Sequence, residues 1–172
     1  MRATSGAEIE IRPMRESDLS PVLEIQGDCY TEVAPESRES LLAKLRAAPT
    51  TCFVATVDDT LGGYLSALPW EFLNPPTLNS EACCLPVNPD CLYLHDLAIS
   101  PQHRKVGAGR ALVEMFLGQR EALRLSRASL IAVQGSASYW ERYGFQIVPM
   151  TEALRQKLSS YGEGVVYMER RG

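Results

Sequence analysis

The segment from residue 91 to residue 133 constrains the fold of this chain of 172 residues more than any other. "CLYLHDLAIS" (91–100) and "SLIAV" (129–133) are apolar runs, which is typical of buried strands. The residues between them carry apolar side chains at helical spacing, which predicts a helix over 106–124. Two strands joined through a helix form a βαβ unit, and such strands run parallel. We therefore predict an α/β fold with this parallel pair near the centre of its sheet.

The chain has the length of one domain, so we predict a single domain over 1–172. Strands and helices alternate along it without internal repeats, which favours a mixed central sheet of about six to seven strands with helices on both faces. In chain order we expect a strand at 8–14, helices at 16–30 and 36–49, a hairpin at 51–68 and, after the βαβ unit, a helix at 136–144, a strand at 145–150, a helix at 151–160 and a strand at 164–170. Residues 69–90 hold five of the 11 prolines and predict a long irregular loop, which in compact domains is usually functional or disordered.

Charge and composition exclude several classes of protein. A formal net charge of -4 argues against a protein that neutralises many nucleic-acid phosphates, and it is compatible with a cationic substrate such as an amine. No apolar run approaches the roughly 20 residues that span a bilayer, and the N-terminal residues lack the apolar core of a signal peptide. We therefore expect a cytoplasmic protein that binds no membrane. Five cysteines fit reduced thiols there, and the spacing of Cys83, Cys84 and Cys91 fits no usual zinc site, so we expect no metal.

The turn "RKVGAGR" (104–110) lies between the first of these strands and the helix, and it predicts a phosphate-binding site. The first N–H groups of a helix are unpaired and lie at the positive end of its dipole, so they bind anions. Gly107 and Gly109 would let a diphosphate approach the main chain, and basic residues flank them. The spacing fits neither the Rossmann nor the Walker pattern. The alternative is a solvated basic turn without a ligand.

Two segments carry motifs at the separation seen in a known family. Arg104-x-x-Gly107-x-Gly109 matches the pattern Q/R-x-x-G-x-G/A, and "SYWERYGF" (138–145) is similar to "FYEKLGF". The first pattern binds acyl-CoA in the GNAT superfamily of N-acyltransferases, and the second occurs later in the same family. The order of elements, including the two early helices, also resembles that family over nearly the whole chain.

The resemblance implies that acetyl-CoA is the co-substrate. Amides from Lys105 to Arg110 would bind its pyrophosphate, and the main chain of Leu97 and Ile99 would pair with its pantetheine arm as an added strand does. The implied cofactor-binding residues are Leu97, Ala98, Ile99, Arg104, Lys105, Val106, Gly107, Ala108, Gly109, Arg110 and Trp140. We expect Gly107→Asp to abolish binding and to leave the fold intact.

His95 is the candidate general base. An aliphatic amine is mostly protonated at pH 7 and must lose that proton before it attacks a thioester, and a histidine is suited to accept it near neutral pH. Alternation along a strand predicts that Tyr93, His95 and Leu97 share one face and that Asp96 points to the other. "LYLHDLAIS" also resembles the strand of arylalkylamine N-acetyltransferases, in which His95 matches the second of two histidines and Tyr93 replaces the first. The alternative for His95 is a hydrogen-bonded residue packed in the sheet.

The position of the family's general acid, a tyrosine, holds Trp140, whose indole N–H does not release a proton near neutral pH. Tyr139 is the nearest candidate for a catalytic acid, it shares a helix face with Tyr143, and Tyr93 is a further candidate. A thiolate whose thiol has a pKa of about 8.5 leaves readily, so we expect Tyr139→Phe and Tyr143→Phe each to reduce turnover less than about tenfold. Trp140 is expected to form a wall of the thioester pocket.

The sequence gives few indications of which residues would contact the acceptor. The two early helices and the long loop border the acceptor in this family, and here they contain acidic and aromatic residues: Asp28, Glu32, Glu36, Glu39, Trp70, Glu71 and Phe72. We expect the acidic residues, and His103 in the basic turn, to face solvent. The two aromatic residues either line a pocket or fix the loop to the core.

The predicted function is direct transfer of an acetyl group from acetyl-CoA to a primary amine of a small molecule. A non-catalytic acyl-CoA-binding sensor and a protein or peptide N-acetyltransferase are the alternatives. The expected partners are therefore acetyl-CoA and an amine acceptor, with no nucleic acid and no membrane. A homodimer stays open as the oligomeric state.

Overall fold

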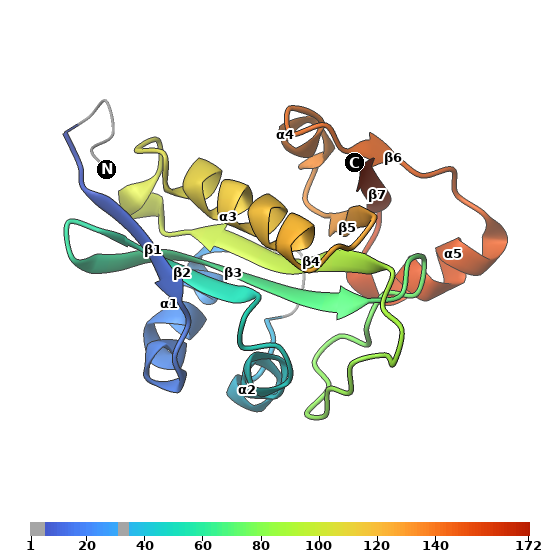
Figure 1. Cartoon of the computed structure of the whole chain (residues 1–172), viewed down its shortest axis with the longest axis horizontal. Coiled ribbons are helices and arrows are strands. Elements are labelled where there is room, and N and C mark those ends of the chain that lie inside the picture. The colour runs from blue at the N-terminus through green and yellow to red at the C-terminus, as the bar shows by residue number, and fades with distance from the viewer. Residues whose placement is uncertain (1–5, 31–34) are drawn as a thin grey trace.

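The computed structural model describes residues 6–30 and 35–172 and contains one mixed sheet (Figure 1). The sheet has seven strands in the order β1-β2-β3-β4-β5-β7-β6. These are β1 (Ile9–Pro13), β2 (Cys52–Val57), β3 (Thr60–Trp70), β4 (Cys91–Ile99), β5 (Arg127–Ala132), β6 (Gln146–Ile147) and β7 (Val166–Arg171). Strands β4 and β5 pair in parallel and the other neighbours pair antiparallel. The predicted mixed α/β sheet around one parallel pair is confirmed.

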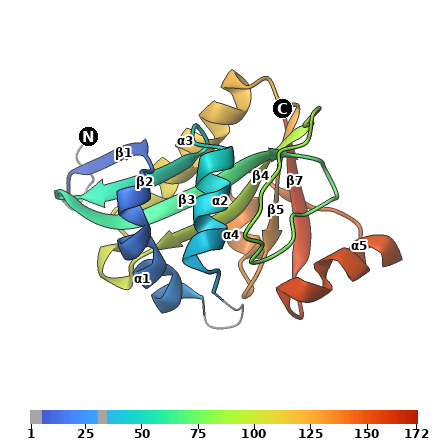
Figure 2. The same ribbon diagram turned by 90° about the horizontal axis from the view of Figure 1, so that it is seen from below.

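Helices cover both faces of the sheet, as predicted (Figures 1 and 2). Helices α3 (Ala108–Ala122) and α4 (Ala137–Glu141) share one apolar core with one face. Helices α1 (Leu19–Cys29), α2 (Arg38–Ala47) and α5 (Glu152–Leu158) pack on the opposite face. Among the described residues, no helix combines the length and the hydropathy that a membrane span requires.

Two strands, β3 and β6, end at residues other than the predicted ones, and in each case a proline is involved. Strand β3 continues through Pro69, which was assigned to the irregular loop and instead pairs with Leu92 of β4. Strand β2 ends its pairing with β3 at Ser66, so the other edge of β3 is free at Pro69, and a residue without an N–H is tolerated on a free edge. Strand β6 is shorter than predicted, because it ends at Ile147, two residues before Pro149.

The parallel pair separates part-way along its length. Pairing of β4 with β5 runs from Cys91 with Arg127 to Leu94 with Leu130, although β4 continues to Ile99. The far half of β4 is therefore paired with β3 on one edge and leaves β5 on the other. This opening lies at the end of β4 that leads into α3.

Candidate functional site

A cavity of about 900 Å³ occupies the opening between β4 and β5. All residues predicted to bind the cofactor or to act in catalysis line it, with the exception of Val106. Val106 is half-buried and packs against the apolar core beneath α3. The structure therefore gathers the predicted residues at one place, from the strand, the turn and α4.

Beyond Leu94, β4 has no strand partner among the described residues on the edge that faces this cavity, although the Ile99 carbonyl there accepts from Sγ of Cys29 and from Nε of Arg104, each at 3.2 Å. The amide of Ser100 donates to the carbonyl of Gly62 at 2.8 Å, and in an antiparallel ladder the alternate residues Leu97 and Ile99 then direct their main-chain groups away from β3. The Leu97 carbonyl accepts a bond from the Tyr30 hydroxyl at 2.7 Å. A ligand arm that pairs with this carbonyl would share it with Tyr30 or displace that side chain.

The first turn of α3 forms a cradle that fits a diphosphate. Gly107 caps the helix with φ of 97°, and its carbonyl accepts from the amide of Ala111 at 3.0 Å, so the amides of residues 108–110 precede the helical ladder. A Cβ on Gly109 would lie 3.2 Å from the Tyr139 hydroxyl, inside the cradle. These amides, with the exposed basic residues of 104–110, are the groups that would hold the pyrophosphate of acetyl-CoA.

The structure corrects the expected effect of Gly107→Asp. A φ of 97° is the left-handed region that side chains rarely adopt, so any substitution there strains the main chain. The fold would therefore lose stability together with the binding site. Gly109 has no such constraint on its φ and is the cleaner position to change.

A β-bulge at His95 overturns the predicted alternation of β4. Ser66 pairs with Asp96 and Ala67 pairs with Leu94, so His95 is an extra residue in β4. An extra residue reverses which face the following side chains occupy. Leu97 therefore packs towards α3, whereas Tyr93 lies in the core on the opposite face. The rings of Tyr93 and His95 remain neighbours, with centroids 6.0 Å apart.

The bulge also brings Asp96 to the cavity, although Asp96 was predicted to point away. The Tyr64 hydroxyl donates to its carboxyl group at 2.5 Å. Burial raises the pKa of Asp96 above its ordinary value, against the opposing effect of its tyrosine partners. Asp96 thus belongs to the polar lining near His95.

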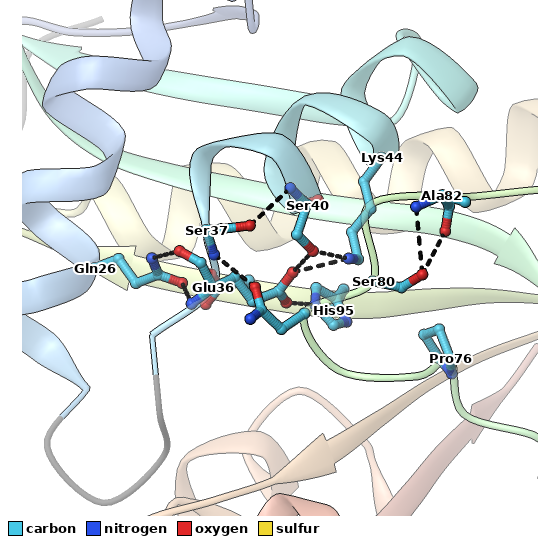
Figure 3. A network of polar contacts seen from close by, with 12 residues as sticks. Gln26, Glu36, Ser37, Ser40, Lys44, Pro76, Ser80, Ala82 and His95 are labelled. Carbon is cyan, nitrogen blue, oxygen red and sulfur yellow. Dashed lines mark hydrogen bonds and ion pairs between the residues drawn. The ribbon is translucent and has the colours of Figure 1, made fainter.

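His95 is held by a buried network that the sequence analysis did not anticipate (Figure 3). Its Nε2 contacts Oε1 of Glu36, whose Oε2 accepts from Nζ of Lys44 at 2.8 Å and from the hydroxyl of Ser40. The exposed side-chain fractions are 2% for His95, 6% for Glu36 and 3% for Lys44. Glu36 was expected to face solvent, and that expectation is wrong.

The position and charge state of Glu36 follow from these contacts. Its main chain exchanges two hydrogen bonds of 3.1 Å with the buried side chain of Gln26, which fixes the segment before α2. Burial alone would raise the pKa of the Glu36 carboxyl, but the contacts with His95 and Lys44 hold that pKa well below its usual range. The carboxyl group is therefore ionised in the folded protein.

One sequence signal points to this network. Glu36, Ser40 and Lys44 are spaced by four residues, so Ser40 and Lys44 share one face of α2 and Glu36 lies just before its N-cap, Ser37. The same helix buries Leu41 and Leu45. When polar residues at helical spacing lie beside buried apolar ones on a helix that covers a sheet, they indicate a buried polar cluster. The net charge of the chain does not reveal this spacing.

The candidate acids occupy different environments. Trp140 is buried in the core, with its ring 5.8 Å from that of Phe145, and it also lines the cavity. The hydroxyls of Tyr139 and Tyr143 are 3.4 Å apart. Burial, together with this partner, raises the pKa of Tyr139. Burial likewise raises the pKa of Tyr93 well above its ordinary value, so neither phenol releases its proton readily.

The other acidic residues of the two early helices and the long loop are exposed, as expected, where the structure describes them. Asp28, Glu39 and Glu71 are exposed, and Glu32 lies outside the described residues. His103 differs from expectation, because it is half-buried and lines the cavity. No group of His, Cys, Asp or Glu in the described ranges 6–30 and 35–172 is arranged to hold a metal ion.

The long loop contributes one residue to the lining of the cavity and is fixed in place by two hydrogen bonds. Pro76 accepts a hydrogen bond from the Tyr161 hydroxyl at 2.6 Å, and Asn79 accepts one from the Ser37 amide at 2.7 Å, so the loop joins the N-terminus of α2 to the segment after α5. Leu78 lines the cavity between these two contacts.

The two aromatic residues at the start of the loop fix it to the core. The indole of Trp70 donates to the Asn74 carbonyl at 2.6 Å, and the ring of Phe72 packs against Tyr167 with centroids 5.6 Å apart. Of the two readings that the sequence left open for them, the structure favours attachment of the loop.

The fold and the geometry of the turn agree with the sequence comparison. Residues 19–145 match the Acetyltransferase (GNAT) family. This chain belongs to the GNAT acetyltransferase family. The resemblance read from the motifs at 104–109 and 138–145 is thereby confirmed. A comparison with curated proteins finds no significant match.

Solved GNAT structures share the fold over nearly the whole chain. The loading GNATL domain of CurA from Lyngbya majuscula is 13% identical with a TM-score of 0.76, covering 95% of this chain and 98% of that one. The PaiA N-acetyltransferase from Thermoplasma acidophilum, in complex with coenzyme A, is 16% identical with a TM-score of 0.67, covering 96% and 99%. The ribosomal-protein-S18-alanine N-acetyltransferase from Escherichia coli is 16% identical with a TM-score of 0.65, covering 95% and 94%.

Proposed function

We propose that this protein transfers an acetyl group from acetyl-CoA to a primary amine of a small molecule. One observation carries the proposal. A single cavity joins the free edge of β4, the amide-rich first turn of α3 and the imidazole of His95. The turn can hold a pyrophosphate, the edge can hold an extended arm, and the imidazole can accept a proton at the end of that arm.

The residues of the chain have separate tasks in this reaction. Bound acetyl-CoA would supply an acetyl thioester with a good leaving group. The amides of residues 108–110 orient it by its pyrophosphate, and His95 takes the proton that the amine loses. Trp140 forms an apolar wall and has no proton to donate. The Tyr139 hydroxyl lies beside the first turn of α3, at the phosphate end of the cavity, which does not favour a role at the thioester.

The walls of the acceptor end support a small acceptor. The loop carrying Leu78 is tied to the N-terminus of α2 and to the segment after α5, and Leu78 lines the cavity between these two attachments. A protein N-terminus or a lysine needs an open groove, whereas a small amine fits an end that a loop encloses. The solved relatives include a protein N-acetyltransferase, so acceptor class is the part of the proposal that most needs a test.

An acetylation screen tests the proposal. The purified protein is given acetyl-CoA with amines, amino acids and peptides, and release of CoA is recorded. We expect turnover with small primary amines, and we expect His95→Gln to lower it by about 10²–10⁴-fold without loss of acetyl-CoA binding. A thermal shift with acetyl-CoA but no turnover with any acceptor would support the sensor. Turnover confined to peptides would support the protein N-acetyltransferase.

A further inference from the structure

The cluster around Glu36 buries charged groups where apolar side chains of the same size could fill the space. A carboxylate and an ammonium form an ion pair that is almost fully buried, and the carboxylate contacts an imidazole on its other side (Figure 3). Burying such a pair often gives no more stability than apolar residues of the same volume. The pair also lies beside the ring of His95, which is the bulged residue of β4 and contacts Glu36. The pair is therefore placed to act on His95.

The contact with Glu36 selects one tautomer of His95. An ionised carboxylate accepts hydrogen bonds and donates none, so the ring nitrogen that faces it carries the proton. That nitrogen is Nε2. Nδ1 then keeps its lone pair, and it is buried without a hydrogen-bond partner among the described residues. His95 lines the cavity, so this unpaired acceptor is available to take a proton from a group bound there.

The charges around the ring act in opposite directions. The Glu36 carboxylate stabilises the protonated ring, and the Lys44 ammonium beyond it destabilises that form. Asp96 on the same strand adds negative charge to the extent that it is ionised. The other titratable neighbours are the phenols of Tyr93 on β4 and Tyr161 after α5, both uncharged near neutral pH because burial raises their pKa values.

We propose that Glu36 is a positioning residue that fixes His95 in the Nε2–H tautomer with Nδ1 as the base, and that Lys44 limits the basicity which Glu36 confers. The proposal rests on the proposed function. In the proton step one N–H bond of the protonated acceptor (R–NH3+) breaks, Nδ1 takes the proton directly or through one water, and the lone pair of the resulting neutral amine becomes free to attack the acetyl carbon. Nε2–H stays bonded to Glu36, so the positive ring charge that forms is stabilised by the carboxylate.

The protonation of His95 in the free protein tests this without any substrate. The chain has two histidines, so imidazole-labelled protein gives two sets of ring signals in NMR spectra, and His103→Gln assigns them. We expect His95 as the Nε2–H tautomer. Glu36→Gln removes the neighbouring charge and should lower the pH midpoint of its titration by about 1–3 units. Lys44→Met should raise that midpoint, because it removes the positive charge that opposes protonation of the ring.

Two further variants keep the test decisive. Glu36→Gln/Lys44→Met removes both charges together, so the fold keeps no unpaired buried ion, and its midpoint should lie between those of the single variants. Asp18→Asn breaks another poorly exposed ion pair, with Arg12 at 2.8 Å, and Asp18 does not line the cavity. It should change stability and leave the His95 midpoint unchanged.

The kinetic arm uses the acceptor found in the acetylation screen. On the acidic side, the pH at which kcat falls to half should shift in each variant by the same amount as the His95 titration midpoint measured by NMR. The KM for acetyl-CoA should stay constant. An Nδ1–H tautomer, or a midpoint that does not respond to Glu36→Gln, would overturn the inference even if the protein acetylates amines. Failure of the wild-type protein to acetylate any acceptor counts against the proposed function, and the NMR result still decides the relation between Glu36 and His95.

Discussion

Gly109→Asp should separate binding of acetyl-CoA from stability of the fold. The pattern Q/R-x-x-G-x-G/A accepts alanine at this position, so the test uses a charge rather than a methyl group. The added Cβ would lie 3.2 Å from the Tyr139 hydroxyl and 3.6 Å from Cγ1 of Ile99. The first contact is tight, but it involves the end of a side chain that can move by a few tenths of an ångström. A carboxylate in the first turn of a helix is favoured by the helix dipole by about 0.3–1 kcal/mol, which offsets that contact. The free energy of unfolding should therefore change by no more than about 1 kcal/mol.

The effect on the ligand should be larger, because the carboxylate would repel a pyrophosphate held by the amides of the same turn. At a concentration of 100 Kd, acetyl-CoA would stabilise the wild-type protein by about 2.7 kcal/mol. For a domain of this size that is a rise in Tm of about 5–10 °C. If the carboxylate weakens binding tenfold, the same concentration is about 10 Kd and the rise falls to about half.

Differential scanning calorimetry with and without acetyl-CoA measures both quantities in one experiment. Gly107→Ala is the matched variant, since it changes the same turn at a φ of 97° and should lower the Tm of the free protein by a few degrees, because the left-handed strain is about 1–2 kcal/mol. If Gly109→Asp keeps the full ligand-induced rise, the first turn of α3 does not hold the pyrophosphate and the assignment of the cavity is wrong.

Two further predictions concern titratable side chains. Tyr139→Phe and Tyr143→Phe should each reduce kcat less than about tenfold, because the CoA thiolate leaves without an acid; a hundredfold loss with intact acetyl-CoA binding would contradict this. The second concerns acid stability. The pKa of Glu36 is lowered by folding, so its contribution to stability is present above its ordinary value of 4.5 and is lost as the pH falls below it. Denaturant unfolding from pH 7 downwards should show a loss below pH 4.5 that is shallower in Glu36→Gln, and equal slopes would refute the assignment.

Much of the fold could be predicted because its signals are local. Strand β4, helix α3 and strand β5 follow from apolar periodicity, and the glycine turn between β4 and α3 follows from its two small residues and its charge. The cavity lining was also largely predictable, since the strand, the turn and α4 come from segments that carry family motifs. Periodicity cannot show how far β4 and β5 stay paired, so the opening itself had to come from the structure.

The missed features depend on contacts between distant segments. Glu36 lies 59 residues from His95 in the chain, and its charge is compensated by Lys44, so its burial is not visible in composition. The bulge is missed for another reason. A strand with an extra residue has the same letters as a regular strand, and only the partner strand β3 reveals that His95 has no partner of its own.

The bulge explains why the opening and the candidate base occur together. Up to Leu94, β4 alternates regularly and pairs with β5; from Asp96 onwards it alternates with the opposite phase and has left β5. A bulge bends a strand and increases its twist, which is what parting from a parallel neighbour requires. The inverted phase turns Ile99 towards Gly109 and the first turn of α3. His95, the extra residue, lies where the two halves meet and stays on the face of α2, within reach of Glu36.

Deletion of His95 should therefore do more than remove an imidazole. It would restore regular alternation, turn Leu97 and Ile99 away from α3, and destabilise the fold, whereas His95→Gln keeps the bulge and should keep the Tm close to that of the wild-type protein. Calorimetry of the two variants would distinguish them, and equal Tm values would show that the bulge does not organise the opening.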